Sequence, residues 1–158
     1  MVFRGSVLKA VPVKLFVLLI YAAFLLCPLE VNAQSPLDDP SSWIGLTITE
    51  VLERFGVPSY VYPVRGLMEW QDDVVFAYTE GDFYLYRDRV WQVCVKSAKG
   101  INFGDPAGVA SLILGSRAET RGGSIFCSLY ERGWPLELRC DTDEAGRVKA
   151  IFIYRPDL

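Results

Sequence analysis

The sequence contains no histidine. Histidine is the most frequent general base, the residue that most often activates a serine or cysteine nucleophile, and the commonest metal ligand. The glycine-rich motifs that bind phosphates or dinucleotides are also absent, as is the Gly-x-Ser-x-Gly motif of hydrolases. These absences predict a protein that is not an enzyme and that holds no metal or cofactor.

Carboxylates are the remaining groups that could carry acid–base chemistry. Asp72 and Asp73 are neighbours, and residues 141–144 read Asp-Thr-Asp-Glu. Both groups fall in predicted turns, where solvation and local hydrogen bonds account for acidic residues. The stretch 141–146 also lacks the full ligand set and the terminal glutamate of a calcium loop. A hydrolase that uses two carboxylates remains an alternative.

An excess of positive charge is absent too. The full chain carries 16 Lys and Arg against 19 Asp and Glu, which gives a formal net charge of −3. Proteins that bind nucleic acids normally present a basic face. We therefore expect no nucleic-acid partner.

The chain has no apolar run of the roughly 20 residues that a spanning helix needs. Its longest run, Leu15–Leu26, follows three basic residues and precedes the small-residue stretch 31–33. This layout is typical of a secretory signal. It predicts a signal peptide over residues 1–33, cleavage between Ala33 and Gln34, and a periplasmic or secreted protein.

Two membrane-bound alternatives stay open. The signal could be retained as an anchor. Cys27 could be lipidated, although lipoprotein signals place a small residue before the cysteine and Leu26 is bulky. We expect contact with a membrane only in these two cases.

Three cysteines remain after such a cleavage, Cys94, Cys127 and Cys140. An exported protein can form disulfides, but three thiols cannot all pair within one chain. Either one bridge forms, with Cys127 and Cys140 as the candidates, beside one buried thiol, or all three thiols are buried.

A first helix is predicted between Gly45 and Gly56, after a polar, flexible lead-in at residues 34–42. Thr47 and Glu50 have the spacing of a capping box. The apolar residues that follow recur at helical spacing and form one stripe. Gly56 suits the left-handed position that ends a helix, and a proline follows soon after it.

A second segment between Gly104 and Gly115 repeats this glycine frame at the same length. Asp105 could cap the helix and Pro106 suits its first turn. Because this segment is apolar all round, we expect its helix to be the more buried of the two.

Strand periodicity follows each helix. Gly81 and Gly133 mark corresponding hairpin turns. The stretches Asp88–Val95 and Gly146–Ile153 then align without a gap. The expected strands are residues 60–64, 74–78, 82–86, 89–95, 124–130, 135–140 and 147–154.

The repeated order of helix, hairpin and final strand predicts an internal repeat. We expect an α+β fold of two tandem helix-plus-antiparallel-hairpin-sheet units, residues 43–99 and 100–158, with the helices packed on one face of the sheet.

The first glycine frame resembles a motif of β-lactamase inhibitory protein and of the SmpA/OmlA (BamE-like) outer-membrane assembly lipoproteins. The matching residues are Gly45-Leu46-Thr47, Val51 and Gly56-Val57-Pro58. The second frame has Arg117 where the proline would stand. The resemblance implies a tandem fold whose sheet is presented to a partner. The second short helix of the tandem inhibitors is not evident, so inhibition of β-lactamase is not implied.

Aromatic residues make the sheet face the candidate binding surface. If Phe83 and Leu85 meet the helix, Tyr84 and Tyr86 stand on the open face. Tyrosine and tryptophan dominate interface hot spots, but they also form cross-strand pairs that merely stabilise a sheet. The candidate protein-binding residues are Trp70, Gly81, Asp82, Tyr84, Tyr86 and Trp91.

The sequence therefore predicts an exported, non-enzymatic protein-binding module of the cell envelope, whose partner is another envelope or extracellular protein. Two alternatives stay open: a scaffold that resembles the outer-membrane assembly lipoproteins, and a binder of a small ligand such as a glycan or a lipid.

Overall fold

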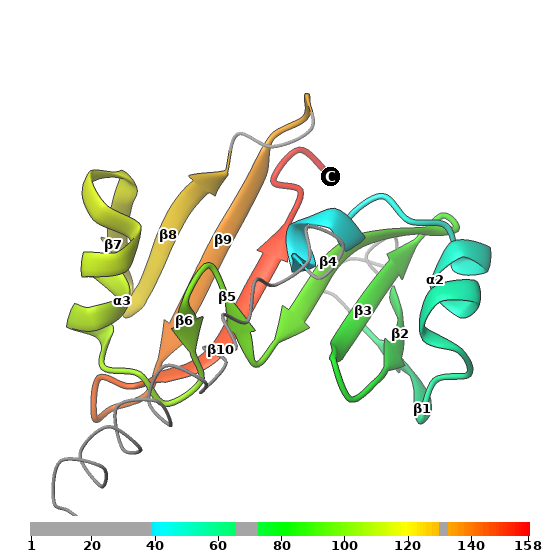
Figure 1. Cartoon of the computed structure of the whole chain (residues 1–158), viewed down its shortest axis with the longest axis horizontal. Helices are drawn as coiled ribbons and strands as arrows, with labels where there is room; N and C mark the ends of the chain where they lie inside the picture. Colours follow the sequence, from blue (N-terminus) through cyan, green and yellow to red (C-terminus); the bar gives the residue numbers. More distant parts are fainter. Residues whose placement is uncertain (1–38, 66–72, 130–132) are drawn as a thin grey trace, which may run out of the picture. The chain divides into compact units, whose positions relative to one another are not determined.

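The computed structural model describes residues 39–65, 73–129 and 133–158, which belong to one compact unit, Gln34–Leu158 (Figure 1). The expected signal peptide, its cleavage site at Ala33 and Gln34, and Trp70 lie outside the described residues. Within the described ranges, no helix has both the length and the apolar character needed to span a bilayer.

Short helices and ten strands make up the described residues. The helical elements are the 3-10 helix η2 (Pro40–Trp43), the α-helices α2 (Ile48–Phe55) and α3 (Ala107–Leu114), and the 3-10 helix η4 (Gly115–Arg117). The strands are β1 (Tyr60–Val64), β2 (Asp73–Ala77), β3 (Gly81–Tyr86), β4 (Arg89–Val95), β5 (Ser97–Ala98), β6 (Ile101–Asn102), β7 (Ala118–Arg121), β8 (Ser124–Leu129), β9 (Leu136–Thr142) and β10 (Val148–Tyr154).

Eight of these strands form one antiparallel sheet in the order β1-β2-β3-β4-β10-β9-β8-β7. Figure 1 shows β4 beside β10 in its middle. The two strands pair from Val95 opposite Ile151 to Gln92 opposite Tyr154. Strands β5 and β6 form a separate two-stranded hairpin.

This sheet corrects the predicted fold class. Two tandem helix-plus-hairpin units are not what the chain builds: its described residues form mostly one large eight-stranded antiparallel sheet, with two short α-helices. The internal repeat inferred from the glycine frames is wrong as a description of the fold. The physical reason is the pairing of β4 with β10, which satisfies the backbone groups of two strands that would otherwise be sheet edges.

The first predicted helix is confirmed as α2. The Thr47 hydroxyl accepts a hydrogen bond from the Glu50 backbone N–H over 3.2 Å, and a Glu50 carboxylate oxygen accepts one from the Thr47 backbone N–H over 2.8 Å. This capping box satisfies two of the amide groups that a helix start leaves free. Gly56 ends the helix with a φ of 76°.

The second helix differs from its prediction. Pro106, not Asp105, is the N-cap of α3, and the Asp105 carboxylate instead accepts a hydrogen bond from the Asn102 backbone N–H over 2.8 Å. Only Ala110 and Leu114 of this helix are buried, and Leu112 is 81% exposed. The helix is still the more buried of the two, as expected, because α2 buries only Val51, but it keeps much of its apolar surface in solvent.

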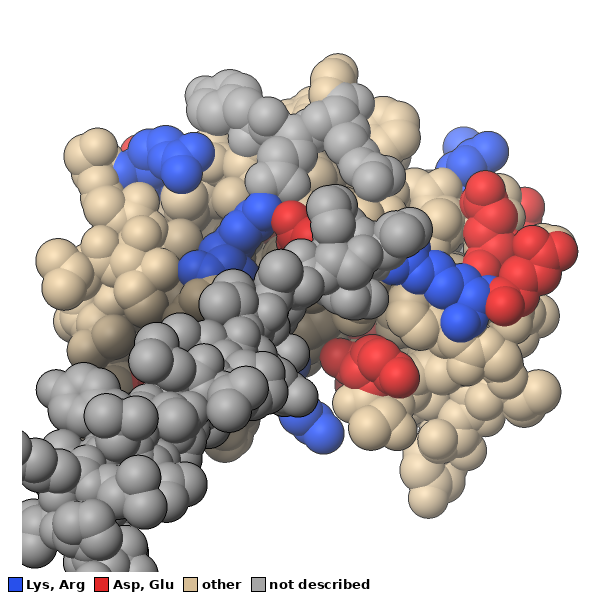
Figure 2. Space-filling view, in the orientation of Figure 1, with Lys and Arg blue, Asp and Glu red and all other residues tan. Residues whose placement is uncertain are grey.

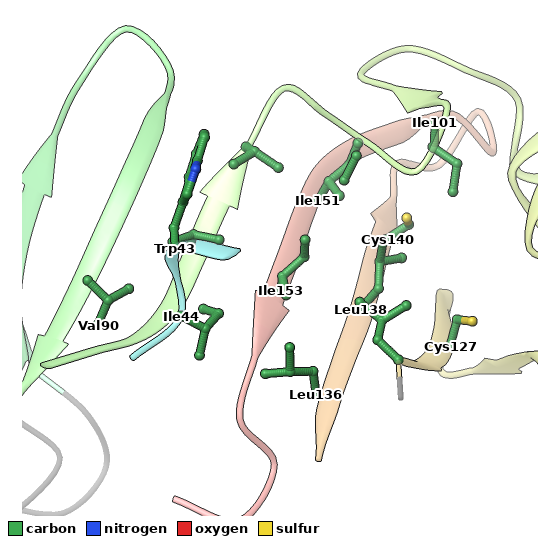
Figure 3. Close-up of a cluster of buried hydrophobic side chains, with 14 of the residues drawn as sticks. Trp43, Ile44, Val90, Ile101, Cys127, Leu136, Leu138, Cys140, Ile151 and Ile153 are labelled. Carbon is green, nitrogen blue, oxygen red and sulfur yellow. The ribbon is translucent and has the colours of Figure 1, made fainter. Parts of the chain in front are cut away.

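One face of the sheet carries a continuous core. The register aligns one buried row over neighbouring strands: Phe83, Val93, Ile153, Leu138 and Cys127. Figure 3 shows side chains of β9 and β10 on the same side as Trp43 and Ile44. Val51 of α2 and both buried residues of α3 belong to this cluster.

The packed part of the chain begins before residue 43. Ser41 and Ser42 of η2 are buried, so residues 39–42, expected as part of a flexible lead-in, are ordered against the core. The Asp39 carboxylate caps η2 by accepting a hydrogen bond from the Ser41 backbone N–H over 3.1 Å, and it binds the Lys99 ammonium over 2.7 Å.

Candidate functional site: the aromatic face of the sheet

The face of the sheet opposite the core carries most of the tyrosines of the strands. Strand β3 alternates between buried and half-buried residues, so Phe83 and Leu85 point into the core and Tyr84 and Tyr86 point to the other side, as the sequence predicted. We call this second side the aromatic face. Its rings belong to Tyr60, Tyr62, Tyr84, Tyr86, Phe126, Phe152 and Tyr154.

Two rows of residues run across the aromatic face. One spans all eight strands in the order Tyr60, Ala77, Asp82, Cys94, Phe152, Arg139, Phe126 and Glu119. The neighbouring row contains Tyr62, Val75, Tyr84, Gln92, Tyr154, Glu137 and Ser128. Strand pairing thus brings together residues that lie far apart in the chain.

The half of the face built by β1 to β4 combines tyrosines with a carboxylate. The Tyr62 hydroxyl donates a hydrogen bond to Asp82 Oδ2 over 3.1 Å. Desolvation and the neighbouring Asp82 raise the pKa of Tyr62. Burial, followed by the nearby Cys94 and Tyr62, raises the pKa of Tyr84 to about 12. All these hydroxyls therefore stay protonated at neutral pH and can donate hydrogen bonds.

The half built by β7 to β10 combines aromatic rings with arginines. The guanidinium carbon of Arg139 lies 4.4 Å from the centroid of the Phe152 ring, and its Nε lies 3.1 Å from Asp141 Oδ1. The Tyr154 hydroxyl donates a hydrogen bond to Glu137 over 2.5 Å. Burial and this carboxylate raise the pKa of Tyr154.

Cys94 occupies the middle of the aromatic face, where β4 meets β10. Its side chain is half-buried, and Asp82 and Phe152 stand opposite it on the two flanking strands. Burial and the Asp82 carboxylate raise the pKa of the Cys94 thiol. A thiol with a raised pKa is a poor nucleophile at neutral pH, because the thiolate is the reactive form.

The predicted site residues have different positions. Asp82, Tyr84 and Tyr86 share the aromatic face. Gly81 presents no surface: it is buried, and a Cβ added there would lie 2.5 Å from the Cys94 carbonyl oxygen. Trp91 is the extra residue of a β-bulge in β4, and its indole Nε1 is buried without a hydrogen-bond partner among the described residues.

Sequence reasoning missed half of the face. Tyr62, Phe152, Tyr154 and Arg139 were not among the predicted residues. Two of these rings could have been found from the alternation of β10. Ile151 and Ile153 are buried, whereas Phe152 and Tyr154 are half-buried and point to the other face. Nothing in the local sequence indicates that they lie beside β4, because that pairing joins strands far apart in the chain.

Cys127 and Cys140, the candidate disulfide pair, are free buried thiols in the structure. Figure 3 shows both on the core side of neighbouring strands. Register places Cys127 opposite Leu138 and Cys140 opposite Ile125, so the two cysteines are diagonal neighbours. Burial raises the pKa of Cys140 to about 12. The chain thus has three free thiols among its described residues.

Charge is dispersed over the visible surface. Figure 2 shows Lys, Arg, Asp and Glu in separate small groups between uncharged regions, and its visible described residues form no continuous basic area. Across the ranges that the structure describes, no group of three or more His, Cys, Asp or Glu side chains is arranged to hold a metal ion.

Comparison with solved structures shows a likeness of fold. An extracellular protein of Bacillus anthracis str. Ames that contains an SCP domain superposes with a TM-score of 0.51 at 12% identity, over 78% of this chain and 48% of that one. A cysteine-rich secretory protein of Staphylococcus aureus subsp. aureus Mu50 gives a TM-score of 0.44 at 14% identity, over 73% of this chain and 44% of that one. This chain spans less than half the length of either protein. The sequence matches no protein-family model, and no curated protein matches it.

These comparisons correct the resemblance drawn from the glycine frame. The structure that superposes with a TM-score above 0.5 is an extracellular protein that contains an SCP domain, so the assignment to the fold group of β-lactamase inhibitory protein and the BamE-like lipoproteins is wrong. A short and tolerant helix motif is met by many sequences that place a capped helix before a strand.

Proposed function

We propose that this protein is an exported, non-enzymatic module that binds another protein of the cell envelope or the extracellular space through its aromatic face. The observation that carries the proposal is the register of the sheet. It brings aromatic, carboxylate and guanidinium side chains of different strands into common rows on the side that faces away from the core.

Such a face has the chemistry of a protein interface. Tyrosine rings supply large contact area at a small entropy cost, and their hydroxyls can satisfy polar groups of a partner. Here the rings stand on β-strands, which hold them in position before binding. Contacts within the face, such as Tyr62 to Asp82 and Tyr154 to Glu137, fix them further. A surface that is ordered in advance loses less entropy on association.

Export is supported by two independent features. The N-terminal sequence has the layout of a secretory signal. The superposed solved structures are described as extracellular or secretory proteins. The absence of histidine from the sequence and the raised pKa of the Cys94 thiol support a binding role in place of a catalytic one.

Site-specific photo-crosslinking in the native host tests this function. A benzophenone amino acid replaces Tyr84 or Tyr154 on the aromatic face, and replaces Val57 in a matched control. Val57 is 89% exposed and lies in the turn before β1. We expect light-dependent adducts with one protein from both face positions and none from the control position.

The adducts must also depend on the rest of the face. Removing the Tyr86 ring by Tyr86→Ala should reduce crosslinking from position 84 while the melting temperature changes little. Adducts with glycan or lipid alone would replace the proposal with a small-ligand binder. Equal protein adducts from position 57 would show that the contacts are non-specific.

A further inference from the structure

The two halves of the aromatic face differ in how their rings are partnered. On the β7 to β10 half, Arg121 lies 5.0 Å from the Phe126 centroid, and Arg139 lies 4.4 Å from the Phe152 centroid. Each guanidinium also lies within ion-pair distance of a carboxylate: Arg121 Nη2 is 2.8 Å from Glu119, and Arg139 Nε is 3.1 Å from Asp141, although this Nε makes no hydrogen bond among the described residues. The recurring set on this half is a ring, a guanidinium and a carboxylate.

On the other half the Arg87 guanidinium lies 5.2 Å from the Tyr86 centroid, but a second group of rings with a carboxylate has no such cation. Tyr60, Tyr62 and Tyr84 surround Asp82 in the register of β1 to β3. Among the described residues, no Lys or Arg lies over any of these three rings. The Asp82 carboxylate likewise has no cation of the described chain within ion-pair distance. Its one hydrogen bond comes from the Tyr62 hydroxyl to Oδ2, which leaves Oδ1 free to accept another.

We propose that these four residues form a binding site for an arginine side chain of the partner protein; we name it the tyrosine–aspartate site. The inference rests on the proposed function and specifies its partner. A guanidinium would complete on this half the set of three groups that the chain completes with its own arginines on the other half. Arginine favours such places because its planar cation stacks on rings while its N–H groups bind a carboxylate.

The floor and walls of the site suit a flat side chain. In one row Ala77 separates Tyr60 from Asp82; in the next Val75 separates Tyr62 from Tyr84 and is fully buried, so the accessible part of the site is the first row. Tyr60 and Asp82 stand two strands apart, a spacing of about 10 Å, so a guanidinium above Ala77 can lie near the Tyr60 ring and the Asp82 carboxylate at once. Tyr60 is 74% exposed and Tyr62 36% exposed, so both are accessible to a partner.

The site is also prepared electrostatically for a cation. The Tyr62 and Tyr84 hydroxyls are neutral at neutral pH, since tyrosine ionises near pH 10 and their pKa values are raised further. The electron-rich faces of neutral rings attract a cation, and the Asp82 charge adds to that attraction. An anionic partner group would meet the same carboxylate with no guanidinium of the site to offset it.

Titration of the 15N-labelled protein with the tripeptide Gly-Arg-Gly, followed by NMR, tests the inference. Gly-citrulline-Gly is the matched control ligand, because citrulline has nearly the shape of arginine without its charge. We expect saturable shifts of the backbone amides of β1 and β3 with Gly-Arg-Gly, and binding that is at least about fivefold weaker with citrulline. A single side chain offers little contact area, so the dissociation constant should lie in the millimolar range.

Variants locate the effect. Asp82→Asn keeps an oxygen for the Tyr62 hydroxyl and should weaken Gly-Arg-Gly about fivefold. Tyr60→Ala removes an exposed ring at the sheet edge and should weaken it without unfolding the protein. Glu53→Gln, an exposed carboxylate of α2, should change nothing. Melting temperatures of all variants establish that they fold.

Equal affinity for arginine and citrulline would overturn the inference, as would unchanged affinity in both Asp82→Asn and Tyr60→Ala. The failure would remain separate from that of the proposed function. Crosslinks from positions 84 and 154 with no preference for arginine would leave a protein-binding face whose partner is recognised differently. Preference for arginine without any protein crosslink would leave a cation site and remove the protein partner.

Discussion

Trp43 stacks on Phe83, with ring centroids 5.2 Å apart and an interplanar angle of 21°. Phe55 of α2 and Tyr78 pack against the same Phe83 ring, with centroids at 4.8 Å and 5.4 Å. Trp43 therefore holds strand β3 in place, and the opposite side of β3 carries Asp82 and Tyr84. Packing on the core side and the geometry of the aromatic face are coupled through β3.

Removing the Trp43 ring should destabilise the whole protein. Trp43 is 6% exposed, so Trp43→Ala leaves a large cavity and should lower the unfolding free energy by about 3–5 kcal/mol. Trp134 is 37% exposed, and Trp134→Ala should cost clearly less. Urea unfolding of both variants, followed by circular dichroism, measures the difference. Equal losses would mean that η2 does not anchor the core.

Two glycine-to-alanine substitutions should have opposite signs. At Gly81 an added Cβ would lie 2.5 Å from the Cys94 carbonyl oxygen, a backbone atom that cannot move away cheaply. Gly81→Ala should therefore destabilise the sheet at the β3–β4 pair. At Gly108 of α3 the added Cβ meets nothing within 4 Å, so Gly108→Ala should stabilise by up to about 1 kcal/mol. Thermal melts compare the two variants directly.

The two leucines of α3, one buried and one exposed, should also behave differently. Leu114 is 7% exposed and Leu112 is 81% exposed. We expect Leu114→Ala to cost about 2–4 kcal/mol through its cavity, and Leu112→Ala to stay within about 0.5 kcal/mol of the wild type. Chemical unfolding measures both. A large loss at Leu112 would show that this surface is covered in solution, for example by self-association, which analytical ultracentrifugation would detect.

The extent of prediction from sequence follows from how local each feature is. The α2 helix and strands such as β1 and β4 were predicted because caps and alternation are short-range signals. The pairing of β4 with β10 could not be predicted from these signals, because alternation shows which face of a strand is buried but not which strand lies beside it. The short polar strand β7 gave no alternation signal. The exposed side of α3 could not be predicted, because an apolar sequence without helical periodicity does not indicate which side of the helix is buried.

The free energy of unfolding at acidic pH should depend on Asp39. Partial burial alone would raise the pKa of this carboxyl, but hydrogen bonds from Lys99 and Ser41 outweigh it and lower the pKa below its usual value. A lowered pKa stabilises the fold above the ordinary carboxyl value of about 4 and loses that contribution as the pH falls through the lowered value. Asp39→Asn should cost about 0.5–1 kcal/mol at pH 7 and less at pH 2.5. Urea unfolding at the two pH values checks this, with Glu53→Gln as a control; a loss that does not change with pH would contradict it.

The stability of the fold at alkaline pH should depend on Tyr84. Its pKa is raised to about 12, chiefly by burial and then by Cys94 and Tyr62, whereas an unfolded tyrosine ionises near 10. Because the folded state holds the proton more tightly, its contribution is complete below pH 10 and is lost as the pH rises toward 12. Absorbance of tyrosinate at alkaline pH should therefore lose a late component in Tyr84→Phe, and the melting temperature of that variant should fall less steeply between pH 9 and 11. Since Tyr84→Phe keeps the ring, it should also retain binding of Gly-Arg-Gly within about twofold, which separates stacking by the ring from any need for its hydroxyl. Loss of a component near pH 10 in place of the late one in Tyr84→Phe would mean that this hydroxyl is freely solvated, and the enclosed side of the tyrosine–aspartate site would then be open to water.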